Sequence, residues 1–328
     1  MTSAGGAMQP TVPAARGEVS AALIEALTSD GHLPVVLADM DPYGEDLHLA
    51  LHVCYELHYR GFAGVSDDWE WDPGLLSVRR DLERQFLEAL RRDVGGGTDV
   101  AGEFDELLVL PADGEGLSGY LAQEAERWQL EEYFALRSIY HLKEADPHVW
   151  VIPRLQGQPK AALVAVEYDE FGGGRAENLH AKLYADLLDG AGLSSEYLHY
   201  QDQAPAAMLA VVNLMSMFGL HRSLRGALVG HFAAAEISTA PSAKNIVTAL
   251  QRFDADERCV RFYTEHIEAD AVHEQVMRHD VVDALLKDEP DLAADVVLGI
   301  QATELVEARF GEHVLQAWRA GESALLPT

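Results

Sequence analysis

The chain has 328 residues, of which 48% are hydrophobic, and it carries a formal net charge of −30 at pH 7. This length and hydrophobic content are enough for one large domain or two small ones. Because so acidic a protein repels polyanions, neither nucleic acid nor an anionic membrane surface is expected as a partner. Only two cysteines occur, Cys54 and Cys259, so a disulfide framework and a cysteine-based zinc site are excluded, and a reducing cytoplasm is the expected location.

Two features of membrane or exported proteins are missing from the sequence. No run of about 18 apolar residues occurs, so no membrane span is predicted. The first residues lack a positively charged start followed by an apolar core, so no signal peptide is predicted.

The first third of the chain is predicted to be a helical extension. Residues 1–16 are small, contain Pro and Gly and lack periodicity, so we expect a disordered tail. The segment 94–116 contains three consecutive glycines and several acids, and is expected to be a loop or linker. Because 17–116 contain little core, we interpret them as an extension of the domain over 117–328. Apolar residues recur at helical spacing over 17–29, 44–60 and 74–93.

The rest of the chain is also predicted to be helical, and no strand alternation of convincing length occurs, so the fold class is all-α. Pro147 is expected to end a helix and Pro241 to mark a turn, while the glycines at 172–174 break or kink the chain. Trp128 is expected to face inward. Helices are predicted over 118–145, 158–170, 175–190, 204–219, 222–238, 241–252 and 262–279, with one or two more over 278–306.

The predicted helix over 44–60 contains His48, His52 and His58. Their spacing does not place three of them on one face together with a carboxylate. We therefore interpret them as residues of a helix surface or groove and not as metal ligands.

The segment 262–279 carries His266, Asp270 and His273 at positions i, i+4 and i+7. On an α-helix these three side chains lie on one face. That face is expected to point inward because Phe262 lies at a nearby angle. Two imidazoles and a carboxylate form a ligand set for Fe, Mn or Zn. The alternative is a solvated acidic helix that happens to carry histidines.

A dinuclear iron or manganese site in a helical bundle also needs carboxylates that project into an apolar interior. Glu236 lies in the run ALVGHFAAAEIST, where a buried carboxylate is costly unless it binds a cation or is strongly hydrogen-bonded. Its alternative is a buried ion pair with Arg222 or Arg225. Glu170 closes the apolar run AALVAVEYDE, and its alternative is a surface acid at a helix end.

Two further acids lie close to histidines. Glu177 precedes His180 by three residues, on the same face of the helix predicted after the glycine break. Its alternative is an acid of the first turn that faces the helix dipole. Glu144 lies in IYHLKEADPH beside two histidines, and its alternative is an exposed acid near a helix end.

Taken in chain order, these residues resemble the pattern of the haem-oxygenase-like diiron oxidases and oxygenases, which are often described as iron-containing redox enzymes. The pattern consists of Glu170, His180, Glu236, His266, Asp270 and His273. The segments YDEFGGG, NLH and EHIEADAVHEQ are similar to characteristic segments of that family, and the resemblance covers residues 118–305. It implies a haem-oxygenase-like helical bundle that binds two iron ions per chain. It also implies a further carboxylate ligand, for which Glu144 and Glu177 are the matching candidates.

The resemblance implies an enzyme that activates O2, with electrons from an external donor, to oxidise a small organic substrate. N-oxygenation, C–H desaturation and C–C cleavage are all compatible with it, and a homodimer is a further expectation. Two other hypotheses stay open. One is a non-catalytic binding module with the same fold, and the other is a mononuclear metal hydrolase, which lacks the usual His-Glu-x-x-His helix. Candidates for an apolar pocket beside the metals, each with core packing as its alternative, are Met215, Met217, Phe218, Tyr263 and Trp128.

Overall fold

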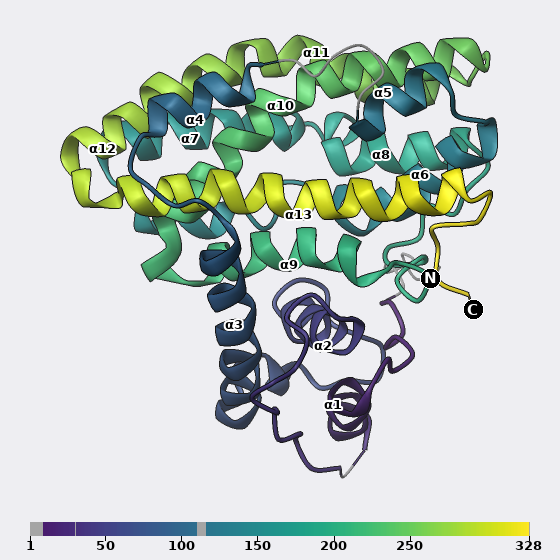
Figure 1. Cartoon of the computed structure of the whole chain (residues 1–328), viewed down its shortest axis with the longest axis vertical. Helices are drawn as coiled ribbons and strands as arrows, with labels where there is room; N and C mark the ends of the chain where they lie inside the picture. The colour runs from purple at the N-terminus through teal and green to yellow at the C-terminus, as the bar shows by residue number, and fades with distance from the viewer. Residues whose placement is uncertain (1–8, 30, 110–115, 328) are drawn as a thin grey trace, which may run out of the picture.

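The computed structural model describes residues 9–29, 31–109 and 116–327, and the side chains of 268–271 are also outside the description. Within these residues the chain forms α-helices, short 3-10 helices and one π-helical segment, with no strand. The predicted all-α class is therefore confirmed. The helices form a bundle, onto which the N-terminal helices pack (Figure 1).

The N-terminal part contains four helices, of which the first three lie below the bundle in Figure 1 and the fourth lies against the bundle higher up. Their bounds are α1 Glu18–Thr28, α2 Glu45–Glu56, α3 Pro73–Asp93 and α4 Val100–Leu107. The helix α4 lies within the segment predicted to be a loop, and that prediction is wrong. Asp99 accepts a hydrogen bond from the Gly102 backbone and caps the helix, while Phe104 is buried against the bundle.

In the described part of the chain, the bundle itself is built from nine further α-helices. Their bounds are α5 Gly116–Gln123, α6 Arg127–His141, α7 Gly157–Glu170, α8 His180–Gly190, α9 Ala206–Leu220, α10 Arg225–Arg252, α11 Glu257–Gln275, α12 Ala284–Asp288 and α13 Ala293–Arg319. A π-helical segment, Val276–Asp283, joins α11 to α12. The longest of these helices, α10 and α13, lie against each other through the middle of the molecule.

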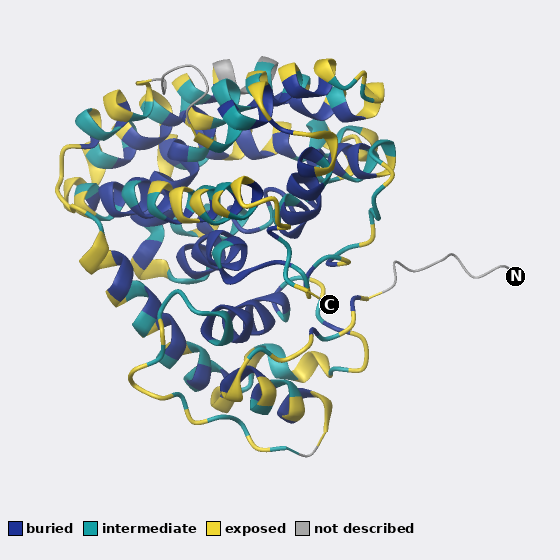
Figure 2. Ribbon diagram, turned by 45° about the vertical axis from the view of Figure 1, so that its right-hand side comes forward, coloured by how far each residue is buried: buried dark blue, intermediate teal, exposed yellow. Residues whose placement is uncertain are grey.

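The helix α9 is buried on nearly every side, as its almost wholly apolar sequence predicts. The N-terminal extension packs against the bundle through buried residues (Figure 2), and buried polar contacts to α9 add to this apolar packing. Asn213 of α9 donates a hydrogen bond to the carbonyl of His48 on α2, at 2.8 Å. A buried ion pair between Lys143 and Glu56 links α2 to the turn after α6. These contacts fix α2 against the bundle.

Two helix boundaries differ from the predictions. One helix begins later than expected because of a capping box, and another continues through a proline. The segment 118–145 is interrupted at Glu124–Glu126, where the side chains of Glu126 and Gln129 form a capping box that starts α6. Trp128 lies in that first turn and is 38% exposed, so its predicted inward position is wrong. Pro241, in contrast, lies inside the continuous helix α10, so the predicted turn there is also wrong.

Three further predictions differ from the structure. Residues 175–190 are helical only from His180, because short 3-10 turns precede α8. Of the predicted helix surface or groove, the surface is wrong for His48 and His52, because both are fully buried. Residues 9–16 are held against the chain and not disordered: the Arg16 guanidinium donates to the carbonyls of Gln201 and Ala204 and pairs with Glu45. The first eight residues of the predicted tail lie outside the described part.

In the described part of the chain, no one helix has both the length and the apolar character needed to cross a membrane, although α9 and the bent continuation over 222–252 meet that test as a pair.

Candidate metal centre

A loop of three glycines brings the end of α7 back to the start of α8. Gly172 has a φ of +69°, and a β-carbon there would overlap the backbone of Asn178 and Leu179, so this approach requires glycine. The result is that Glu170 and His180, ten residues apart in sequence, face each other. The distance from His180 Nδ1 to Glu170 Oε2 is 2.9 Å, and both side chains are buried. Burial lowers the pKa of His180, but the Glu170 carboxylate outweighs this, and the net pKa is raised.

His266 enters the same site from α11. Its Nδ1 lies 2.7 Å from the backbone carbonyl oxygen of Phe262, so Nδ1–H donates to that carbonyl and Nε2 keeps a lone pair. A backbone carbonyl of this kind commonly fixes the tautomer of a metal-bound histidine. The rings of His266 and His180 have centroids 4.4 Å apart. Two imidazoles from different helices therefore converge at one place.

Glu144 reaches this place from the turn that follows α6. One carboxylate oxygen lies 3.5 Å from His266 Nε2, and the other lies 3.1 Å from His141 Nδ1. Burial raises the pKa of Glu144, but the adjacent His141 and His266 outweigh burial and hold its pKa well below the usual range. The buried side chain is thus an anion, which suits it to bind a cation.

A second cluster lies around His273, two turns further along α11. Its Nδ1 is 3.1 Å from Glu236 Oε2 on α10 and 3.8 Å from Glu170 Oε1, and its Nε2 is 3.2 Å from Asp169. Burial lowers the pKa of His273, but the hydrogen bond with Glu236 raises it, to about 9. Burial raises the pKa of Glu236 more than its contact with His273 lowers it.

The buried side chains form two groups whose possible ligand atoms lie within 4.8 Å of one another. Glu170 belongs to both groups. One group consists of Glu144, Glu170, His180 and His266, and the other of Glu170, Glu236 and His273. Carboxylate oxygens and imidazole nitrogens are ligands that iron, manganese and zinc accept. Because several acids are buried together, bound cations would offset a repulsion that is otherwise costly.

The structure thus brings together five of the six residues of the sequence pattern and adds Glu144. The sixth, Asp270, lies in α11 between His266 and His273, but its side chain is among those outside the described part of the chain. Glu177 belongs to neither group, because it lies exposed in the turn after the glycines. Glu236 contacts His273, and Arg225 pairs instead with Glu289, so the predicted alternative of a Glu236–Arg225 pair is not what forms.

A cavity of about 300 Å³ borders the first group. Of the residues proposed from the sequence to line a pocket, Met215 and Tyr263 line this cavity, whereas Met217 and Phe218 belong to the core. Several polar side chains that the sequence did not single out also line it, namely His148, His231, Ser238, Thr239, Ser242 and Thr303. The only sequence signal for His231 is its place in the apolar run that holds Glu236.

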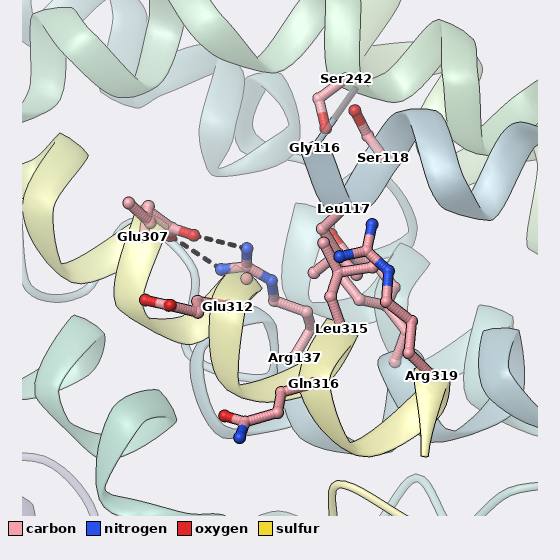
Figure 3. A pocket seen from close by; sticks show the side chains of 13 residues that line it. Gly116, Leu117, Ser118, Arg137, Ser242, Glu307, Glu312, Leu315, Gln316 and Arg319 are labelled. Carbon is pink, nitrogen blue, oxygen red and sulfur yellow. Dashed lines mark hydrogen bonds and ion pairs between the residues drawn. The ribbon is translucent and has the colours of Figure 1, made fainter. Parts of the chain in front are cut away.

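A larger pocket of about 800 Å³ lies outside this cavity, and four residues line both. They are Tyr133, Arg137, Ser242 and Glu307. In Figure 3 the Arg137 guanidinium faces the Glu307 carboxylate through two interactions, of 2.8 and 2.6 Å. Burial lowers the pKa of Arg137, but Glu307 outweighs this and keeps the guanidinium charged. An ion pair therefore stands between the outer pocket and the inner cavity.

The sequence profile of a family described as iron-containing redox enzyme matches residues 131–308. A nitrosourea synthase from Streptomyces achromogenes subsp. streptozoticus is 24% identical over 189 residues, which are 56% of this chain and 40% of that protein. The chain thus spans less than half the length of that relative.

One solved structure with a similar fold is a domain of unknown function with a haem oxygenase-like fold from Shewanella denitrificans OS217. The TM-score is 0.50 at 16% sequence identity, and the match covers 70% of this chain and 95% of that chain. At this identity the likeness concerns the fold alone. The family match includes Glu144 and all the other residues of both groups.

Proposed function

Because this chain belongs to the family of iron-containing redox enzymes, we propose that it is a non-haem diiron oxidase or oxygenase that uses O2 to oxidise a small organic substrate. The observation that carries this proposal is the place of Glu170 in both ligand groups. A carboxylate that contributes to two neighbouring groups is suited to bridge two cations. A site for a single ion would not need the second group.

In the proposed centre each group holds one ion. Glu144, His180 and His266 belong to one position, while Glu236 and His273 belong to the other. We propose Asp270 as a further ligand at the second position, because it shares a helix face with both histidines of α11. Two iron ions bound here would supply the reductive activation of O2.

The chain's own residues set the protonation and orientation of the ligands. The Phe262 carbonyl holds the proton of His266 on Nδ1 and so leaves Nε2 to bind metal. Glu170 faces His180 and orients its ring from the other side of the glycine loop. Asp169 contacts His273 and acts in the same way at the second position. The ligands are thus aligned before any ion binds.

The substrate is proposed to occupy the inner cavity. Its volume of about 300 Å³ suits a small molecule, and core side chains such as Phe232 and Phe262 form part of its lining. Of the three outcomes that the family pattern allows, oxidation at nitrogen is the one supported by the similarity to a nitrosourea synthase. Electrons are proposed to come from an external donor. The two free, buried cysteines fit a proposed cytoplasmic location.

The test is the metal content of the protein. The full-length chain would be produced with added Fe(II), freed of loosely bound metal and analysed for iron, together with His266→Ala. About two irons in the unmodified chain and a marked loss in the variant are expected. His279→Ala is the matched control, because His279 lies on the π-helical segment with its side chain mostly exposed, and it should leave the iron content unchanged.

Iron-dependent consumption of O2 in the presence of a reductant separates an enzyme from a binding module. No iron in either protein, with folding unchanged, would refute the diiron proposal and favour the non-catalytic module. Zinc in place of iron, without any reaction with O2, would favour the hydrolase.

A further inference from the structure

Three buried side chains of the inner cavity form a hydrogen-bonded chain outside the two ligand groups. His148 comes from the turn after α6, His231 from α10 and Thr303 from α13. The Nε2 atoms of His148 and His231 are 3.1 Å apart, and His231 Nδ1 is 2.8 Å from Thr303 Oγ1. The Thr303 hydroxyl donates in turn to the carbonyl oxygen of Gly299, at 2.7 Å.

These hydrogen bonds determine which nitrogen of each imidazole ring carries the proton. Since the Thr303 hydroxyl proton is used toward Gly299, its oxygen accepts a hydrogen bond, and His231 must carry a proton on Nδ1. Burial lowers the pKa of His231 to about 4 and that of His148 well below its usual value, so both rings are neutral. His231 Nε2 is therefore an acceptor, and His148 donates to it from its own Nε2. The proton of His148 is thus fixed on Nε2.

His148 Nδ1 is then a buried acceptor, and within the described residues it has no hydrogen-bond partner. The side chain is 2% exposed and lines the cavity that also contains Glu144 and His266. A buried acceptor without a partner is costly unless a ligand satisfies it. The Tyr263 hydroxyl lines the same cavity and also has no partner among the described residues.

The position of His148 is firmly held. Its ring stacks on Phe232, with centroids 4.2 Å apart. Its backbone N–H donates to the carbonyl of Ala145, at 2.8 Å, and the preceding Pro147 carbonyl lies against Gly219, where a β-carbon would overlap it. The ring therefore has little freedom to turn Nδ1 toward another protein group.

We propose that His148 Nδ1 is a substrate-binding acceptor, which takes a hydrogen bond from an N–H or O–H group of the molecule that is oxidised. Tyr263 Oη–H is the complementary donor, and the substrate class is a small polar molecule with a donor and a neighbouring acceptor, of which an amide is the simplest case. The inference rests on the proposed function only in taking this cavity as the substrate site. His231 and Thr303 are positioning residues, since they act through His148.

The first test is the tautomer of His148 in the full-length chain, labelled with nitrogen-15 histidine and freed of metal by a chelator. Nuclear magnetic resonance is expected to show the proton on Nε2, with His148→Phe used only to assign the signal. A proton on Nδ1 would overturn the proposal. This measurement needs no iron, so it remains informative even if the diiron proposal fails.

The second test compares two probes that differ in one N–H group, N-methylacetamide and N,N-dimethylacetamide. Both present a carbonyl to Tyr263, but only the first can donate to His148. About fivefold tighter binding of N-methylacetamide, measured on the His148 signal, is expected from one additional hydrogen bond. Equal binding of the two amides, or binding of neither, would overturn the proposal.

Two threonines of the cavity provide a matched pair of variants. Thr303→Val removes the acceptor of His231 Nδ1–H and is expected to reduce the preference for N-methylacetamide. Thr239 lines the same cavity but donates its hydroxyl to the Ala235 carbonyl, so Thr239→Val is expected to keep the preference. An unchanged preference in Thr303→Val would contradict the proposal that His231 and Thr303 position His148 through hydrogen bonds.

Discussion

Gly230 of α10 and Val296 of α13 are in direct backbone contact, because a β-carbon at position 230 would overlap the Val296 carbonyl oxygen. The reverse contact exists between Gly299 of α13 and the carbonyl of Ala227. The two longest helices of the bundle thus approach more closely than side chains would permit. His231 follows Gly230 directly, so the same close approach places its ring beside Thr303.

The close approach predicts that Gly299→Ala destabilises the protein. The added methyl group would overlap a backbone carbonyl, which cannot move aside as a side chain could, so the helices must separate. A loss of about 2–3 kcal/mol in the free energy of unfolding is expected. Urea denaturation followed by circular dichroism measures it.

Gly311 provides the control in the same helix. A β-carbon there would make only an ordinary contact with Leu117. Gly311→Ala is therefore expected to be stabilising by about 0.5–1 kcal/mol, as for glycine to alanine in a helix interior. Equal effects of the two substitutions would contradict the packing argument.

Replacing Glu170 or Glu177 by glutamine is expected to have different effects on iron binding. Glu170→Gln removes a carboxylate from both ligand groups, so iron affinity should fall by more than the about 10–100-fold that is typical of residues that only support a ligand. Glu177→Gln should leave iron binding unchanged, because its exposed side chain is in neither group. Iron titration of both variants decides this. A loss of iron in Glu177→Gln would show that this acid moves into the site.

Breaking the ion pair between Arg137 and Glu307 is expected to lower the free energy of unfolding more than breaking a surface ion pair does. Arg137→Met would leave the Glu307 carboxylate without its partner, in partly buried surroundings, at an expected cost of about 1–3 kcal/mol. Arg127→Met, which breaks an exposed pair with Glu131, should cost at most about 0.5 kcal/mol. Urea unfolding of both variants and of Glu307→Gln tests the difference. A similar small cost for all three would mean that the inner pair contributes little.

The buried histidines of α2 predict a loss of stability in acid. Burial lowers the pKa of His48 to about 3 and that of His52 to about 4, so both stay neutral in the folded chain. Below a pH of about 6.5 the unfolded chain binds protons that the folded chain does not, and the free energy of unfolding falls as the pH falls. Each histidine contributes a slope of at most about 1.4 kcal/mol per pH unit.

Unfolding measured between pH 7 and 4.5 checks this slope, since urea denaturation can be repeated across that range. His52→Leu should flatten it, whereas His199→Gln, at an exposed position, should not. The same slope in the unmodified chain and in His52→Leu would contradict a neutral, buried His52.

The helical class and much of the site follow from sequence spacing. The i, i+7 separation of His266 and His273 predicts one helix face, and both side chains are buried there. Glu236 is recognisable because an acid in a long apolar run needs a cation or a strong hydrogen bond. The sequence pattern favours Glu170 over Glu177, but which of the two lies in the site depends on how three glycines turn the chain.

Other features depend on contacts between distant segments. Proline inside a helix costs about 3 kcal/mol, which favours a turn at Pro241, yet the packing of α10 on α13 continues the helix through it. His148 lies in a turn with no periodicity, its partner His231 lies 83 residues further along the chain, and Thr303 lies 72 residues beyond His231. No local pattern reveals a hydrogen-bonded chain of this kind.

The shared place of Glu170 has a consequence for how the proposed centre fills. One carboxylate has to serve two cations, so the second cation meets negative charge that the first has already partly neutralised. The two positions are then unequal even though their ligand types are alike, and a titration should show a tight step followed by a weaker one. A chain that holds a single ion would be a distinct species with its own spectrum, and its abundance would report how strongly the two positions are coupled.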